Sequence, residues 1–260
     1  MGPDAVIFAS YGTTSEGQLA ASIEPVAAAL GAAFPGVPVA RAYTSAKVRR
    51  ALDARGAHVP DVGEALRALV AGGARDVLVV PGHVVAGEAF SLVEQAVAEA
   101  RAAGVPERVR LAAPLLACAD DVRAAGLALA ECWPARPGEA VLLVGHGADA
   151  TAGLPYAALG YRLLELGRGD LVVSCMHGYP DLEAALRLLA RTGARLVRLV
   201  PLMLTAGKHA RSDLAGASPT CWRGHLETAG YEVLPELEGL GSVPAFQKLY
   251  VAHARAAAGR

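Results

Sequence analysis

Short apolar segments alternate with alanine-rich stretches of helical periodicity along the whole chain. The apolar segments predict strands at residues 5–10, 37–43, 76–81, 109–113, 140–145, 171–176, 196–203 and 231–235. Helices are predicted between them, for example at 16–30, 90–103, 119–131, 154–166, 182–192 and 245–258. The strand segments lack polar alternation, as expected of strands that are covered on both faces. Regular alternation of strand and helix therefore predicts an α/β fold of parallel sheets flanked by helices.

An internal boundary is predicted at residues 133–138, where two prolines and a glycine end one helix before the next strand. The sequences on its two sides are similar. The pattern Gly-Ala-Arg-x-Val-x-x-Val-Pro at 73–81 recurs at 193–201, and Val-x₄-Tyr-Gly at 6–12 parallels Val-x₄-His-Gly at 141–147. We therefore expect two similar Rossmann-type lobes, residues 1–134 and 138–260, with a ligand cleft between them.

Composition and charge exclude several classes of function. The chain has 260 residues, a net charge of −1 and 5% aromatic residues, so neither nucleic acid nor an anionic membrane surface is an expected partner. It shows no basic leader and no apolar run as long as a membrane span of roughly 20 residues, so a cytoplasmic location is expected. The four cysteines form no CxxC pattern, which favours reduced thiols over a disulfide framework.

Three of the seven histidines occupy the same position relative to predicted strands. His146 follows strand 140–145, His177 follows strand 171–176, and His209 lies just past strand 196–203. Their imidazoles suit Co²⁺, Ni²⁺, Zn²⁺ and Fe²⁺, and three protein ligands leave coordination positions open for a substrate. Any one of them alone is better explained as an ordinary strand-end residue. Three at equivalent strand ends favour a metal site in the C-terminal lobe.

The N-terminal lobe carries a different set of strand-end residues. The positions that match the three histidines are Tyr11, Tyr43 and Ala89, and none of these is a good divalent-metal ligand at neutral pH. His83 also ends a predicted strand in this lobe. Two roles stay open for it, a substrate or proton-handling group in the cleft and a packed core residue.

The turn at residues 10–14 and the basic residues after it are candidates for binding carboxylates. Backbone N–H groups and hydroxyls in Ser10-Tyr11-Gly12-Thr13-Thr14 could hold an anion at a helix start or simply cap the helix. The turn lacks a phosphate-binding glycine pattern, so no nucleotide is predicted. Four basic side chains near the second strand either attract a polycarboxylate or form a solvated helix face: Arg41, Lys47, Arg49 and Arg50.

Longer motifs run through the chain in a recognisable order. They are Ala-Ser-Tyr-Gly-Thr-Thr at 9–14, Ala-Tyr-Thr-Ser at 42–45, Gly-His-Val-Val-Ala-Gly-Glu at 82–88, Val-Gly-His-Gly-Ala at 144–148, Pro-Leu-Met-Leu-Thr-Ala-Gly-Lys-His-Ala at 201–210, Glu-Gly-Leu-Gly at 238–241 and Val-Ala-His at 251–253. In these motifs the chain resembles the anaerobic cobalt chelatases of the CbiK type. These belong to the class II chelatases, together with protoporphyrin ferrochelatase.

The resemblance implies insertion of Co²⁺ into sirohydrochlorin for cobalamin biosynthesis, without ATP or another nucleotide and without accessory subunits. His146 and His209 match the two metal-site histidines of the family. His177 stands where the family has a glutamate, and Lys208 stands where an acidic residue is expected. These departures leave the metal preference and the identity of the proton acceptor open.

In this interpretation His146, His177 and His209 are both the metal ligands and the catalytic residues. The residues expected to contact the tetrapyrrole are Ser10, Tyr11, Thr13, His83 and Glu88.

Other functions remain open from the sequence. The same ligands would serve a sirohydrochlorin ferrochelatase or a nickel chelatase, or a carrier that binds a metal or tetrapyrrole without catalysis. A two-lobed solute receptor is disfavoured by the missing leader and the short segment between the lobes. The oligomeric state is also open, and a homo-oligomer is among the options.

Overall fold

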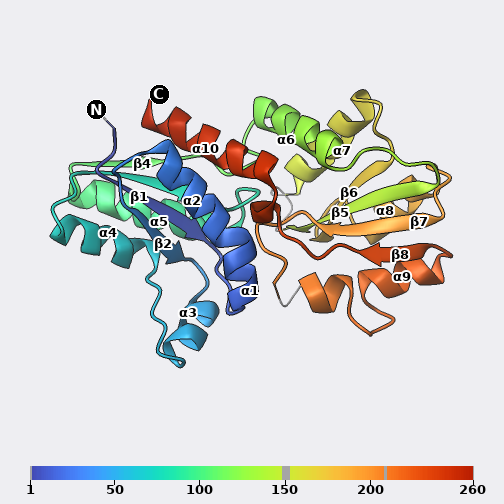
Figure 1. Cartoon of the computed structure of the whole chain (residues 1–260), viewed down its shortest axis with the longest axis horizontal. Helices are drawn as coiled ribbons and strands as arrows, with labels where there is room; N and C mark the ends of the chain where they lie inside the picture. Colours follow the sequence, from blue (N-terminus) through green and yellow to red (C-terminus); the bar gives the residue numbers. More distant parts are fainter. Residues whose placement is uncertain (1, 148–152, 208–209, 260) are drawn as a thin grey trace. The chain divides into compact units, whose positions relative to one another are not determined.

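The computed structural model describes residues 2–147, 153–207 and 210–259, and the chain divides into two compact units (Figure 1). Unit 1 comprises Met1–Leu115 and Phe246–Arg260, and unit 2 comprises Leu116–Ala245. These bounds differ from the expected lobes, because residues 116–134 fall in unit 2 and residues 246–260 fall in unit 1. The difference arises from two helices. Helix α6 (Ala119–Cys132) packs on unit 2, and helix α10 (Pro244–Ala258) packs on unit 1, although unit 2 separates it from unit 1 in the sequence.

Unit 1 is built on a four-stranded, wholly parallel sheet with the order β2-β1-β3-β4. Its strands are β1 Ala5–Ser10, β2 Val39–Tyr43, β3 Asp76–Pro81 and β4 Arg108–Leu111. Its helices are α1 Glu16–Gln18, the π-helical turn η1 Leu19–Ile23, α2 Glu24–Ala33, α3 Ala46–Asp53, α4 Val62–Ala71, α5 Glu88–Ala103 and α10 Pro244–Ala258.

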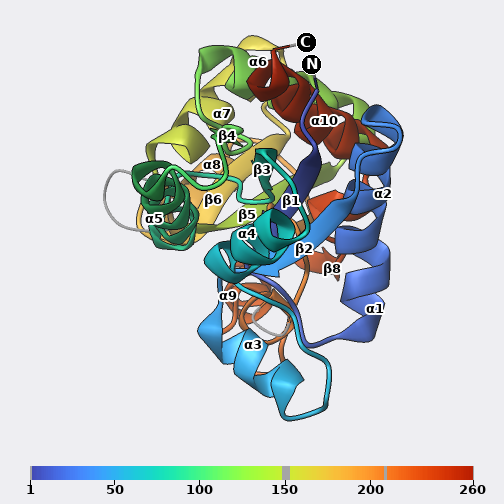
Figure 2. The ribbon, with the colours of Figure 1, turned by 90° about the vertical axis from the view of Figure 1, so that its left-hand side faces the viewer.

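Helices cover both faces of this sheet, as Figure 2 shows. On one face Ile7 and Val79 pack with buried residues of α4 and α5, among them Leu66 and Val93. On the other face the ring of Phe8 meets Tyr250 of α10 edge-on at 6.3 Å. The Tyr250 hydroxyl also donates a hydrogen bond to the Gly82 carbonyl at 3.2 Å. Helix α10 is therefore part of the core of unit 1, although it follows unit 2 in the sequence.

Unit 2 repeats this arrangement with the order β6-β5-β7-β8, again wholly parallel. Its strands are β5 Glu139–Gly147, β6 Leu171–His177, β7 Leu196–Pro201 and β8 Glu232–Pro235. Its helices are α6 Ala119–Cys132, α7 Leu154–Glu165, α8 Leu182–Leu189, the π-helical turn η2 Ala210–Leu214, α9 Trp222–Thr228 and the 3₁₀ turn η3 Leu240–Ser242.

One face of the second sheet packs against α8 and α9 through a core that includes Leu142, Leu189 and Trp222. Helix α7 covers the other face, where Gly160 approaches Val173. Helix α6 packs on α7 at Gly126, where an added Cβ would lie 3.2 Å from the Arg162 side chain. The glycine lets the two helices approach closely, which explains why residues 116–134 belong to unit 2.

The two units confirm the predicted pair of similar α/β lobes. Their strand orders are equivalent, and the bounds of β7 are those of β3 displaced by 120 residues, as in the sequence repeat. The predicted bounds of β1 and β3 are also correct. Strands β5 and β6 run further than predicted, so that they include His146 and His177.

The four cysteines are free thiols; Cys118 is exposed, and Cys175 and Cys221 are buried. Within the described residues, no helix has the length and apolar character needed to cross a bilayer.

Replacing Phe246 with alanine tests the assignment of α10 to the core of unit 1. Phe246 is fully buried, so we expect the substitution to lower the free energy of unfolding by about 3–5 kcal/mol. Leu92→Ala on α5 is the control, because Leu92 is 48% exposed and should lose much less. Chemical denaturation measures both; equal losses would show that α10 does not belong to the core.

Candidate functional site

The structure brings His146 and His177 together at the carboxyl edge of the second sheet. β5 pairs with β6 in parallel register as far as Gly147 opposite His177, and His146 is the residue before Gly147. Within the buried strand β5, His146 is the exposed residue, and His177 is the exposed last residue of β6. Their ring centroids lie 5.1 Å apart with an interplanar angle of 60°. Two solvent-facing imidazoles are thus held side by side by the backbone of the sheet.

This separation is compatible with two imidazoles that bind a single ion. With a metal–nitrogen distance of about 2.1 Å and a tetrahedral angle of about 109°, the two ring centroids would lie about 5 Å apart. The pair also lies beside the topological switch point of the sheet, because the chain adds β6 on one side of β5 and β7 on the other. Ligands of open α/β sheets bind at this position.

A backbone hydrogen bond orients the His146 ring. Nδ1 lies 3.1 Å from the carbonyl oxygen of Gly147, and because a carbonyl only accepts, Nδ1 carries the proton and donates. The lone pair of the neutral ring is then on Nε2. Metal-binding histidines commonly have this arrangement, in which one nitrogen is fixed by a backbone or carboxylate acceptor and the other is left for the ion.

Gly147 is the residue that allows the two strand ends to lie so close. Its φ is +75°, a left-handed conformation that favours glycine. A Cβ at this position would collide with the carbonyl oxygen of His177. Any other residue at 147 would therefore separate the two histidines.

Two buried side chains beneath the pair, Tyr156 and Cys175, hold the strand ends. Tyr156 of α7 is 2% exposed, its ring lies against Gly145, and its hydroxyl hydrogen-bonds to the backbone of Gly147. The Cys175 thiol donates to the His177 carbonyl at 3.2 Å. Burial raises the pKa of Tyr156 above its ordinary value and raises the pKa of Cys175 to about 11, so both side chains are neutral at physiological pH. No sequence motif indicates either role.

The third predicted ligand, His209, and its neighbour Lys208 lie outside the described residues. The chain leaves β7 at the carboxyl edge of the second sheet, where the histidine pair lies. Just past β7, Leu202 N–H donates to the Val144 carbonyl of β5 at 2.7 Å. Across residues 2–147, 153–207 and 210–259, no group of three or more His, Cys, Asp or Glu side chains is placed to hold a metal ion. The described site is therefore a pair of histidines.

The residues expected to contact the tetrapyrrole all lie in unit 1, near the carboxyl ends of β1 and β3. Ser10 is buried at the end of β1, and its hydroxyl has no hydrogen-bond partner among the described residues. Tyr11 is 50% exposed. Thr13 accepts a hydrogen bond from Ser15 N–H at 3.1 Å, and Ser15 caps α1. The turn at 10–14 thus leads into a helix cap that is formed by Ser15, one residue beyond it.

His83 lies just past β3 with both ring nitrogens screened from solvent and without a partner among the described residues. Its ring meets Phe90 edge-on at 6.1 Å. Burial lowers the pKa of His83 to about 4, so the imidazole is neutral at physiological pH. Glu88, by contrast, is the exposed first residue of α5.

The basic residues near β2 are largely engaged with carboxylates or the backbone. Arg41 pairs with Glu24 at 2.6 Å and Arg49 pairs with Asp61 at 3.0 Å. Arg50 donates to the carbonyl of Ala46 at 3.3 Å. This pattern fits a solvated helix face better than a polycarboxylate site.

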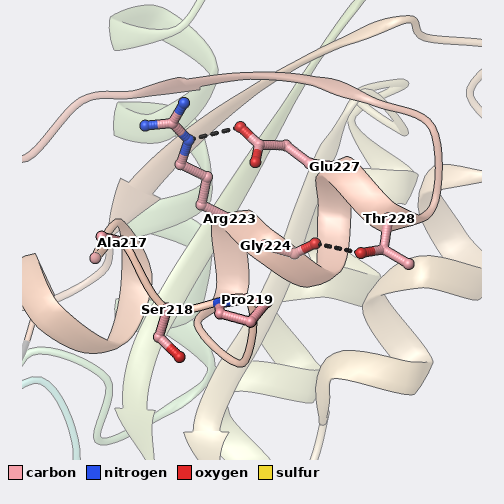
Figure 3. Close-up of a pocket in the computed structure, with 8 residues that line it drawn as sticks. Ala217, Ser218, Pro219, Arg223, Gly224, Glu227 and Thr228 are labelled. Carbon is pink, nitrogen blue, oxygen red and sulfur yellow. Dashed lines mark hydrogen bonds and ion pairs between the residues drawn. The ribbon is translucent and has the colours of Figure 1, made fainter.

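A surface hollow of unit 2 lies apart from the predicted residues in the sequence (Figure 3). Its polar groups are already paired, with Arg223 Nε on Glu227 at 2.6 Å and the Thr228 hydroxyl on the Gly224 carbonyl at 2.8 Å. It is lined by Gly216, Ala217, Ser218, Pro219, Arg223, Gly224, Glu227 and Thr228. None of the predicted site residues takes part in it.

Comparison with known proteins identifies the family. The family described as cobalt chelatase (CbiK) matches residues 4–259, which is nearly the whole chain. The chain belongs to the cobalt chelatase family.

Curated relatives agree with this assignment. The sirohydrochlorin cobaltochelatase of Salmonella typhimurium is 31% identical over 251 residues, which cover 96% of this chain and 94% of the relative. The sirohydrochlorin cobaltochelatase CbiKC of Nitratidesulfovibrio vulgaris is 33% identical over 227 residues, covering 86% of this chain and 80% of the relative.

Solved structures support the fold. SirB from Bacillus subtilis with Fe³⁺ superposes with a TM-score of 0.65 at 15% identity, covering 98% of this chain and 95% of SirB. CbiX, described as the terminal enzyme for biosynthesis of siroheme in denitrifying bacteria, has a TM-score of 0.54 at 17% identity and covers 97% and 99% of the two chains. At these identities the likeness concerns the chelatase-type architecture.

Removing the Tyr156 hydroxyl tests whether it positions the histidine pair. Tyr156→Phe keeps the ring against Gly145 but loses the bond to Gly147, so we expect Co²⁺ affinity to fall about tenfold, the lower end of effects seen for groups that orient ligands. Tyr250→Phe is the matched control, because its buried hydroxyl also bonds a backbone group, in unit 1. Titration followed by cobalt absorption spectra measures both; an unchanged affinity in Tyr156→Phe would contradict the positioning role.

The pKa of His83 predicts an acid-dependent loss of stability. Its folded pKa of about 4 is below the unfolded value of about 6.5, so the unfolded chain binds a proton first as pH falls. The free energy of unfolding therefore keeps the full contribution of neutral His83 above about pH 6.5 and loses it progressively toward pH 4. The loss is about 2 kcal/mol at pH 5. His83→Leu should lose less stability between pH 7 and pH 5 than the wild type. Equal losses in urea unfolding would show that His83 is not buried as a neutral ring.

Proposed function

We propose that this chain inserts Co²⁺ into sirohydrochlorin, without a nucleotide, and that His146, His177 and His209 are its metal-facing and catalytic residues. The observation that carries the proposal is the pair of exposed imidazoles, 5.1 Å apart, at the carboxyl edge of the second sheet. Membership of the cobalt chelatase family and the names of its relatives from Salmonella typhimurium and Nitratidesulfovibrio vulgaris support cobalt and sirohydrochlorin as the substrates.

The reaction exchanges two pyrrole N–H protons for one Co²⁺. The protein must present a partly dehydrated ion to one face of the macrocycle and must accept the protons that leave. His146 binds the ion through Nε2, since Nδ1 is used by the Gly147 carbonyl. His209 holds the ion together with His146. His177 completes the ligand set or, after it has released the ion, accepts one of the two pyrrole protons, and the other proton leaves to solvent water. Neutral imidazole performs both tasks, because its ring nitrogen binds divalent metals and accepts protons near neutral pH.

The strand ends of unit 1 are proposed to contact the tetrapyrrole. Ser10 and His83 bring buried polar atoms without partners among the described residues, so a substrate or an ordered water would satisfy them. Tyr11, Thr13 and Glu88 are the remaining proposed contacts.

We also assign the reaction to the cytoplasm.

Cobalt insertion is favoured over iron or nickel insertion because the relatives from Salmonella typhimurium and Nitratidesulfovibrio vulgaris are named cobaltochelatases. A carrier that binds metal without catalysis would give at most one equivalent of metallated tetrapyrrole per protein molecule. Anaerobic assays with sirohydrochlorin and Co²⁺, Fe²⁺ or Ni²⁺ distinguish these functions by multiple turnover and by relative rate.

His146→Ala tests the central residue of the proposal. We expect kcat/KM for Co²⁺ to fall at least about 100-fold, because one of few ligands is lost, while stability is unchanged since His146 is exposed. His225→Ala is the control, an exposed histidine of α9 in the same unit. Anaerobic absorption spectroscopy measures product formation. If His146→Ala retains the turnover of the control, His146 does not hold the metal.

A further inference from the structure

Two large apolar side chains are exposed on segments that adjoin the end of β6, where His177 lies. Tyr179 is 61% exposed and stands two residues beyond His177. Leu154 is 63% exposed and is the first residue of α7. The two segments touch, because a Cβ on Gly153 would collide with the carbonyl oxygen of Tyr179. Tyr179 and Leu154 therefore lie on adjoining segments, close to the strand end that carries His177.

The segment that carries Tyr179 is anchored at its base. The Ser174 hydroxyl donates to the carbonyls of Pro180 and Asp181 at 2.7 and 2.9 Å, and Cys175 N–H donates to the Pro180 carbonyl at 2.8 Å. Asp181 then caps α8 by accepting from Ala184 N–H at 2.8 Å. With both Pro180 and Asp181 fixed, the exposed ring of Tyr179 extends from a well-supported turn.

Exposure of these two side chains carries a cost that binding would recover. Burying a side chain of this size from water stabilises by roughly 1.5–3 kcal/mol. Scattered exposed apolar residues are ordinary, but adjacent ones beside candidate metal ligands point to a ligand. A tetrapyrrole has a flat apolar face that must lie over the metal site, and a tyrosine ring and a leucine side chain are suited to contact such a face.

We propose that Tyr179 and Leu154 form the contact surface for the macrocycle face of the tetrapyrrole and hold its ring over the histidine pair. This inference rests on the proposed function. It assigns a substrate contact to unit 2, in addition to those proposed in unit 1. The side chains act by apolar contact, so the Tyr179 hydroxyl is not required.

The test is binding of metal-free sirohydrochlorin to the full chain, followed by anaerobic spectral titration. Tyr179→Ala and Leu154→Ala should each weaken binding about tenfold while leaving Co²⁺ affinity unchanged. The matched controls are Tyr161→Ala and Leu164→Ala, which remove equally exposed side chains further along α7, at 66% and 54% exposure. Each control should bind within twofold of the wild type, and so should Tyr179→Phe, which keeps the ring.

Several outcomes overturn the inference. Equal effects in the controls, no effect at Tyr179 and Leu154, or a tenfold loss in Tyr179→Phe would each contradict an apolar contact at this place. A change from oligomer to monomer in Tyr179→Ala, with tetrapyrrole affinity unchanged, would show that the surface contacts a second copy of the chain. If the wild type binds no sirohydrochlorin, the proposed function itself fails, and this result is distinct from a wild type that binds but does not depend on Tyr179.

Discussion

The parallel pairing of β5 with β6 is the interaction on which the candidate site depends. Backbone hydrogen bonds continue along these strands as far as Gly147 and His177, and this fixes the spacing of the two imidazoles before any ligand arrives. The left-handed conformation of Gly147 permits the close approach. Preorganisation of this kind reduces the entropy lost when an ion is bound, because the ligands are already in place.

The same backbone occurs twice in the chain, with different chemistry at its strand ends. The residues that match His146 and His177 in unit 1 are Tyr11 and Tyr43. Tyr11 is 50% exposed, while Tyr43 is buried with its ring against Gly12. Burial raises the pKa of Tyr43, which disfavours the phenolate that a metal would need. The repeat thus supplies one architecture, and a few side chains decide which lobe is suited to bind metal.

The sequence predicted the fold well because its signals are local. Apolar runs gave the bounds of β1 and β3, and the repeat of Gly-Ala-Arg and Val-Pro motifs predicted two similar lobes. The pairing of His146 with His177 could be anticipated as well, since both follow buried parallel strands. Features that depend on tertiary contacts could not. The packing of α10 brings the end of the chain into unit 1, far from it in the sequence. The contact of Tyr156 with Gly147 and the desolvation of His83 depend on how helices and loops pack on the sheets, which no local sequence pattern shows.

X-ray absorption at the cobalt edge tests most directly whether this sheet edge is the metal site. Cobalt bound to the full chain at one equivalent, without tetrapyrrole, should show nitrogen ligands and the outer-shell scattering of at least two imidazole rings. A spectrum with oxygen ligands alone, or with sulfur from the free cysteines, would contradict the account, because the ion would then be bound somewhere other than the histidine pair.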